Sequence, residues 1–187
     1  MRKIILLLVF IVISGMAFSQ TFMHGVGAGL MWSHHPVESI SGGIVYSPKI
    51  IFLQTNRSSV SVGLPIYLAT TPISYRDNES EFATHIPVMV NYNFGRGSTL
   101  TNHTLMGFFV GGGFAYHHGT IENSNKVSSN YRNNIETIDA FGPAANAGIR
   151  IGTGRHTKKN IEVSFFYFKA INAHKLQMFG IGTQYNF

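Results

Sequence analysis

Apolar and polar residues alternate with a period of two most strictly in the last thirteen residues, 175–187. One face of this predicted strand carries Phe179, Ile181, Tyr185 and Phe187, and the other carries Met178, Gly180, Gly182, Gln184 and Asn186. An apolar outer face combined with a small or polar inner face is typical of a barrel wall that faces lipid. The pattern therefore predicts a membrane-spanning β-strand.

Seven further segments show the same alternation. Each is close to the roughly 9 to 11 residues that a tilted membrane strand requires. They are 22–32, 43–53, 59–69, 85–94, 104–116, 141–152 and 160–169. With the C-terminal strand they predict an all-β fold, an eight-stranded antiparallel transmembrane up-and-down β-barrel.

Four prolines fall inside these predicted strands: Pro48, Pro65, Pro87 and Pro143. A proline lacks the backbone N–H that a central strand position donates, so each is expected at a bulge or a strand end. The pattern leaves the strand ends around these prolines open.

The connections between the predicted strands alternate in length. Those at 55–58, 95–103 and 153–159 are turn-like, and those at 70–84 and 117–139 are long and polar. Short turns usually face the periplasm and long loops the exterior. We therefore expect external loops at 33–39, 70–84, 117–139 and 170–174, the third of which contains a polar run at 122–134 that reads as a solvated tip or a recognition surface.

The first nineteen residues have the pattern of a secretory signal. Arg2 and Lys3 precede an apolar run at 4–13, and small or neutral residues follow around 17–19. The run is shorter than the roughly 20 residues of a spanning helix, so we expect cleavage after Ser19 and one barrel domain at 20–187. The chain has no Cys, which excludes disulfides and a lipid anchor attached through Cys.

Composition supports a membrane location. The chain has 20 Gly, 15 Phe and 8 Tyr, with only 12% charged residues. Aromatic rings settle at the two water–lipid boundaries, and glycines in a narrow lumen make room for larger neighbours. The formal charge of +6 is mild and scattered, so no basic stripe indicates a nucleic-acid partner.

Charged residues on the inner faces predict a filled lumen. Arg150 and Glu162 are equally far from a turn centred near His156, which makes them a directly opposed cross-strand pair, and Lys49 also points inward. Large inward residues should fill the remaining space, namely Leu53, Tyr67, Phe109, Phe166 and Phe168. The alternative is a polar path for a solute along these charges.

The signal segment, the glycine-rich strands, the sequence Ile-Pro-Val-Met-Val-Asn-Tyr-Asn-Phe-Gly at 86–95 and the terminal Tyr185-Asn-Phe187 together resemble small outer-membrane barrels. The resemblance is to the OmpX and OmpA-barrel type, in the style found in Bacteroidetes-like bacteria. It implies the outer membrane of a Gram-negative bacterium and contact with its lipid. It also implies that the barrel-insertion machinery reads Tyr185 and Phe187.

Nothing in the pattern specifies a reaction, so we expect a non-enzymatic protein that works through its surface. Two roles fit: recognition or adhesion by the external loops, or an accessory subunit of an outer-membrane assembly that docks through lipid-facing residues such as Phe165 and Tyr167. No catalytic, cofactor-binding or metal-binding residue is predicted.

Histidines at the expected external end leave a metal-binding alternative open. They are His34, His35, His85, His117, His118 and His174, which could bind zinc, copper or haem iron. Neighbours on a strand point to opposite faces, so His117 and His118 could share one ion only if the strand has already ended.

An enzyme that modifies lipid A is the other alternative. Its parts would be a histidine, a serine and an acid near the outer rim. The candidates are His34, His85 and His117, Ser33 and Ser39, and Glu38 and Glu81. Their spacing matches no hydrolase or acyltransferase motif.

Overall fold

The structure, a computed structural model, describes residues 20–35, 39–72, 80–99, 102–122, 135–153, 159–172 and 175–187. The predicted signal segment lies outside these residues, so its cleavage stays a prediction. Within the described ranges, no helix is long and apolar enough to cross a membrane.

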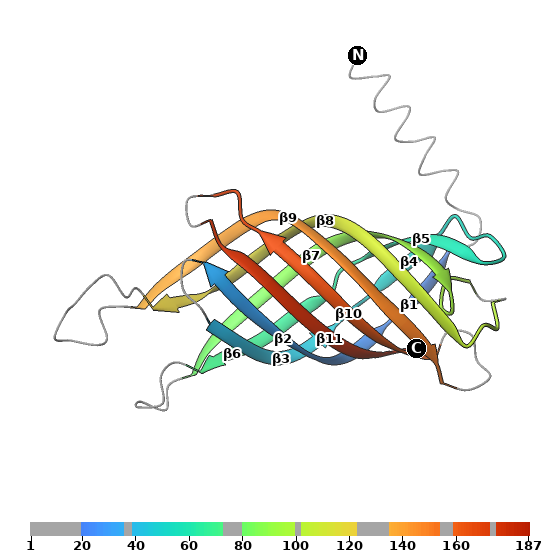
Figure 1. Ribbon diagram of the computed structural model, residues 1–187, viewed down its shortest axis with the longest axis horizontal. Coiled ribbons are helices and arrows are strands. Elements are labelled where there is room, and N and C mark those ends of the chain that lie inside the picture. Colours follow the sequence, from blue (N-terminus) through green and yellow to red (C-terminus); the bar gives the residue numbers. More distant parts are fainter. Residues whose placement is uncertain are drawn as a thin grey trace, which may run out of the picture.

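Eleven antiparallel segments form one closed sheet (Figure 1). They are β1 (Thr21–Met23), β2 (Gly25–His35), β3 (Ser39–Tyr46), β4 (Lys49–Phe52), β5 (Ser58–Gly63), β6 (Ile66–Pro72), β7 (Ser80–Gly95), β8 (Met106–Glu122), β9 (Ile135–Gly152), β10 (Asn160–Lys169) and β11 (Gln177–Asn186). The pairs β1/β2, β3/β4 and β5/β6 are each one barrel strand with a single interruption. The segments therefore make the predicted eight-stranded barrel, which closes where β11 pairs with β2.

The two ends of the barrel differ. The chain enters at Thr21 and ends at Phe187 on the same end, where the backbones of His24 and Phe187 hydrogen-bond to each other. We call this the terminal end, and it also carries the connections 53–57, 96–105 and 153–159. At the opposite end, called the loop end, β2 ends at His35, β6 at Pro72, β8 at Glu122 and β10 at Lys169 (Figure 1).

Three of the four prolines lie at or beside two interruptions of the strands, one between β3 and β4 and one between β5 and β6. Pro48 separates β3 from β4, and Pro65 separates β5 from β6. Pro87 lies in β7 opposite the second gap, because β7 pairs with β6 as far as His85 and with β5 from Met89 onward. The donor that each proline lacks is therefore missing where the ladder is already broken.

The fourth proline lies at the end of a ladder. The β9–β10 ladder ends at the pair Ala144 and Phe168, and Pro143 is the next residue of β9. Pro48 and Pro65 thus lie at strand ends, as predicted, whereas Pro87 and Pro143 lie inside β7 and β9, each where the ladder on one side is interrupted or ends.

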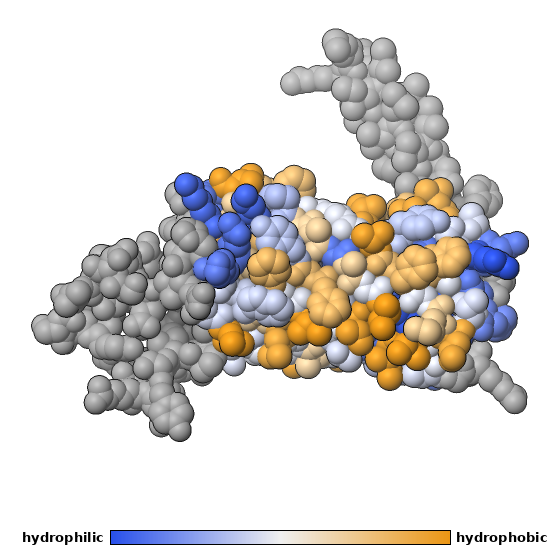
Figure 2. Space-filling view, in the orientation of Figure 1, coloured by the Kyte–Doolittle hydropathy of each residue, from blue (hydrophilic) through white to orange (hydrophobic). Residues whose placement is uncertain are grey.

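The outer wall is apolar, as the alternation predicts. Figure 2 shows hydrophobic side chains over the middle of the wall and hydrophilic ones near the two ends. Exposed outward residues include Val26, Leu30, Ile44, Val88, Val90, Val110, Phe165 and Ile149. A wall of this kind is stable in a bilayer, so the protein is a membrane-spanning β-barrel of the outer-membrane type.

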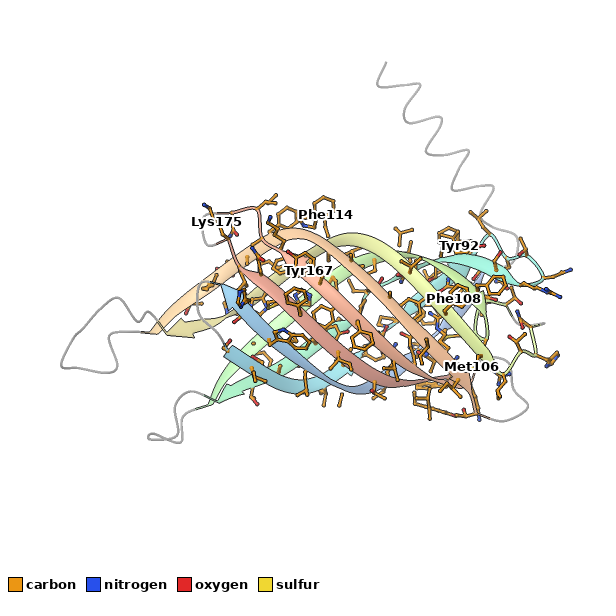
Figure 3. The ribbon with its side chains drawn as sticks, viewed as in Figure 1. Tyr92, Met106, Phe108, Phe114, Tyr167 and Lys175 are labelled. Atoms are coloured by element: carbon orange, nitrogen blue, oxygen red, sulfur yellow. The ribbon has the colours of Figure 1, made fainter. Side chains whose placement is uncertain are left out.

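Aromatic rings gather toward both ends of the wall. Phe114 and Tyr167 lie toward the loop end, and Tyr92 and Phe108 lie toward the terminal end (Figure 3). Ring contacts extend both groups. Tyr167 contacts Phe179 at 4.9 Å and Phe108 contacts Phe94 at 5.1 Å between ring centroids. These are the two belts expected at the water–lipid boundaries.

Two sequence expectations are wrong. Leu53 does not point into the lumen: it is 63% exposed in the turn after β4, with a positive φ of 49°. The predicted strands 104–116 and 141–152 are too short, because the β8–β9 ladder continues to the pair Glu122 and Ile135. The described outward side chains of that extension, His118, Thr137 and Asp139, are polar because the extension lies beyond the aromatic belt, so a search for apolar outward positions does not find it.

The lipid-facing assignment predicts a depth-dependent cost of charge. Replacing Val110, which is 57% exposed between the belts, with Arg should destabilise the folded barrel by about 2–4 kcal/mol. The matched control Thr137→Arg lies beyond the belt and should cost much less. Unfolding in lipid vesicles with urea measures both, and equal costs would contradict the assignment.

Candidate functional site

Glu162 is the centre of the buried polar network in the terminal half of the lumen. Its Oε2 accepts hydrogen bonds from Lys49 Nζ at 2.9 Å and from Arg150 Nε at 2.7 Å. Asn186 Nδ2 donates to the same oxygen at 3.1 Å, and Gln184 Nε2 donates to Oε1 at 2.6 Å. Four donors from three strands thus stabilise one buried carboxylate.

Arg150 extends this network across the barrel. Its Nη1 donates to Asn93 Oδ1 at 2.9 Å, and Asn93 Nδ2 donates in turn to Ser61 Oγ at 3.0 Å. The guanidinium carbon lies 4.6 Å from the centroid of the Phe109 ring. The network therefore connects strands on opposite sides of the lumen and fixes its cross-section.

The predicted pairing of Arg150 with Glu162 is confirmed, since the two residues are direct register partners. The sequence also placed Lys49 inside the lumen, but it did not reveal that Lys49 reaches Glu162. These two residues lie 113 positions apart, and β1, β2 and β11 separate their strands in the barrel order.

The connection after β7 closes the terminal mouth of the barrel. Arg96 is buried, and its guanidinium donates to the carbonyls of Thr104 and Lys159. The following residue, Gly97, has a positive φ of 72°, and an added Cβ there would lie 3.1 Å from the Arg150 side chain. The sequence predicts only a short turn here, because the inward folding depends on these distant contacts.

Rings fill the next layer toward the loop end. Tyr67, His85, Phe166 and Phe168 are buried and contact one another, with ring centroids 5.0 to 6.0 Å apart. A Cβ on Gly180 would lie 2.2 Å from the ring of Phe166, so only glycine fits opposite this ring. The predicted use of glycine to make room in the lumen is confirmed at this position.

Two small cavities lie between these layers. One, of about 20 Å³, is lined by Lys49, Arg150 and Glu162 among others, and another, of about 10 Å³, is lined by His85 and Met89 among others. Cavities of this size hold a water molecule or a small ion. Apart from such cavities, inward side chains fill the described lumen, as the inward Tyr67, Phe109, Phe166 and Phe168 predict.

The residues considered for catalysis do not converge. His34 is exposed on the outer face, whereas His85 and His117 are buried on the inner face. The hydroxyl groups of Ser33 and Ser39 hydrogen-bond to each other at 2.9 Å. Glu38 lies outside the described residues, and the side chain of Glu81 is not among those described.

The histidine cluster is also divided between the two faces. His117 points inward and His118 points outward, so the two do not share an ion, as the strand geometry predicts. Among the described residues, no group of three or more His, Cys, Asp or Glu could hold a metal ion. His174 lies outside those residues, and the side chain of His35 is not described.

The sequence analysis missed a polar cluster on the outer face at the loop end. Asp139 accepts hydrogen bonds from the Tyr116 hydroxyl and from His118 Nδ1, and its backbone carbonyl accepts one from Asn172 Nδ2. His118 and Asp139 are register partners on β8 and β9. The cluster marks where the outer face of this hairpin changes from apolar to polar.

Beyond that cluster the β8–β9 hairpin continues without a ladder to either neighbouring strand. β7 pairs with β8 only as far as the pair Thr84 and His118, while the β8–β9 ladder continues for four further residue pairs. On the other side, Ile171 N donates to Phe141 O, and Asn172 caps the carbonyl of Asp139. In the described part of the chain, no strand pairs with the outer edge of β9 beyond this point.

Comparison with known proteins supports the fold. No family model matches the chain, and no curated protein sequence matches it. Among solved structures, the attachment invasion locus protein Ail of Yersinia pestis is similar at 13% identity and a TM-score of 0.57, covering 90% of this chain and 98% of that one. Neisserial surface protein A is similar at 9% identity and a TM-score of 0.56, covering 90% and 97%.

These likenesses extend over nearly the whole described barrel. At such low identity they show the fold, which is that of the small outer-membrane barrels, as the sequence resemblance implied. With the apolar wall and the aromatic belts, the fold makes this chain an outer-membrane protein of the Gram-negative type.

The central position of Glu162 generates a stability prediction. Replacing Glu162 with Ala leaves two buried cations without a carboxylate and should destabilise the barrel by about 3–5 kcal/mol. The Arg150→Met and Glu162→Ala double variant should lose less than the sum of the single losses. Unfolding midpoints in vesicles measure this coupling, and strictly additive losses would refute the pairing.

The filled lumen generates a permeability prediction. Vesicles that contain the barrel should swell in a small sugar no faster than protein-free vesicles, because side chains occupy the path. Rapid swelling that depends on the amount of folded barrel would show that a polar path exists.

Proposed function

We propose that this protein recognises an external protein ligand by pairing it with the free outer edge of the β8–β9 hairpin, without catalysis. The observation that carries the proposal is the continuation of β9 to Ile135, well past the end of its ladder with β10, so that no described strand pairs with this edge. Recognition through the loop end is one of the two roles that the sequence indicates.

Backbone geometry supplies the binding groups. Because Phe141 O accepts a bond from the β10 side, the two-residue period directs the backbone groups of Thr137 and Ile135 to the same side. An extended segment of another protein can bond to such an edge, with alternate side chains deciding specificity. Natural proteins normally cover exposed strand edges or keep them short. An uncovered edge on a paired hairpin therefore suits binding of another strand.

The position of the edge suits recognition. It lies at the loop end, which the usual arrangement of short and long connections directs to the cell exterior. The segment 122–134 that joins the two strands consists mainly of polar residues, as is typical of a loop exposed to water. Ail, which has the same fold, is by its name an attachment and invasion protein, which supports a role in surface contact.

The assembly-subunit role has less support. Phe165 is exposed on the outer wall and Tyr167 contacts Phe179, as expected for docking residues. The same features are expected of any lipid-facing belt, so they do not favour a protein partner over lipid. A catalytic role has no converging residues to support it.

A proline substitution tests the proposal. In Thr137→Pro, the lost N–H is the one directed to the free edge, so the β8–β9 ladder keeps its bonds. Peptides selected from a random displayed library on the barrel in nanodiscs should bind this variant at least roughly tenfold more weakly, since strand addition needs that donor. Biolayer interferometry measures the affinities.

Two controls make the result specific. Thr137→Val keeps the backbone donor and should bind the selected peptides like the natural chain, whereas deletion of 124–134 tests the connecting loop separately. If Thr137→Pro binds as well as Thr137→Val, the edge is not the binding surface. Loss only on loop deletion would move recognition to the loop itself.

A further inference from the structure

Two histidines face each other inside the barrel near the loop end. His85 on β7 and His117 on β8 are direct register partners, and both point into the lumen. Their ring centroids are 5.8 Å apart. Neither residue belongs to the Glu162 network or to the β8–β9 edge.

The protein does not satisfy the hydrogen-bonding groups of this pair. His85 is fully buried, and neither of its ring nitrogens has a hydrogen-bond partner among the described residues; the same holds for His117 Nδ1. The rings of Tyr67, Phe166 and Phe168 surround His85 and offer their faces or edges. Buried polar groups without partners are costly and rare, so two such imidazoles side by side point to a ligand between them.

The donor set limits the chemistry of that ligand. Zinc sites use at least three protein ligands, and no group of three or more His, Cys, Asp or Glu occurs in the described part of the chain. Calcium and magnesium require oxygen ligands, which this aromatic layer does not supply. Monovalent d10 ions such as Cu(I) and Ag(I) bind stably to two imidazole nitrogens, and their single charge is favoured by surrounding ring faces.

We propose that His85 and His117 bind one soft monovalent metal ion, of which Cu(I) is the biological example, through one nitrogen of each imidazole ring. The ring separation suits this, because two metal–nitrogen bonds of about 2 Å each and two ring radii of about 1.1 Å each place the centroids about 6 Å apart, close to the observed 5.8 Å. His117 retains 9% exposure, so one of the two imidazoles is in contact with solvent. A cavity of about 10 Å³ beside His85 is also lined by Met89, whose thioether is a soft group.

Copper binding by the whole barrel in nanodiscs tests the proposal. Under anaerobic conditions, Cu(I) is titrated into the protein in competition with a chromophoric Cu(I) chelator. The natural chain should take up one equivalent, and its copper X-ray absorption spectrum should show two nitrogen ligands. His85→Phe and His117→Leu should each bind at least tenfold more weakly, since each removes one of the two ligands.

His118→Leu is the matched control, because it removes an imidazole one position away on the opposite face. It should bind one equivalent like the natural chain. The mobility of unheated protein on gels shows whether each variant is folded, and the spectrum of the natural chain tests the site even if a variant fails to fold. The proposal is overturned if the natural chain takes up no copper, if the spectrum shows ligands other than two nitrogens, or if the folded His85 and His117 variants bind as tightly as the control.

Discussion

Inside a bilayer every backbone N–H and C=O must find a partner in the protein, and this constraint shapes the whole molecule. The ladder between β2 and β11 closes the sheet, so no strand edge faces lipid. The prolines occupy only positions where a ladder is interrupted or ends. In the described part of the chain, unpaired edges appear on hairpin extensions at the loop end, such as that of β8 and β9, where water can satisfy the open groups.

Closure with eight strands leaves a narrow lumen, which side chains must fill. Charge placed in that lumen is tolerated because Glu162 joins Lys49 and Arg150 and accepts further bonds from amides. Aromatic rings occupy the next layer, with Gly180 opposite the ring of Phe166. The interior of the described barrel is therefore a packed core that stabilises the wall.

The sidedness of the strands reverses at the loop end. Within the bilayer the outward residues are apolar, but on the β9 extension Ile138 and Ala140 are buried on the inside and Thr137 is exposed on the outside. The Asp139 cluster lies at this change. One hairpin therefore has a lipid-facing half and a water-facing half, and each half follows the environment that surrounds it.

The sequence alone determined the strand number, the lipid-facing side of each strand and the opposition of Arg150 to Glu162. These depend on a two-residue period and on counting from one short turn, which are local properties. The tertiary structure decided the reach of Lys49, the inward folding around Arg96, the facing of His85 and His117, and the length of the β8–β9 hairpin. The first three depend on the register between strands that are distant in sequence or joined by an irregular connection. The hairpin length depends on where the lipid boundary lies along the barrel.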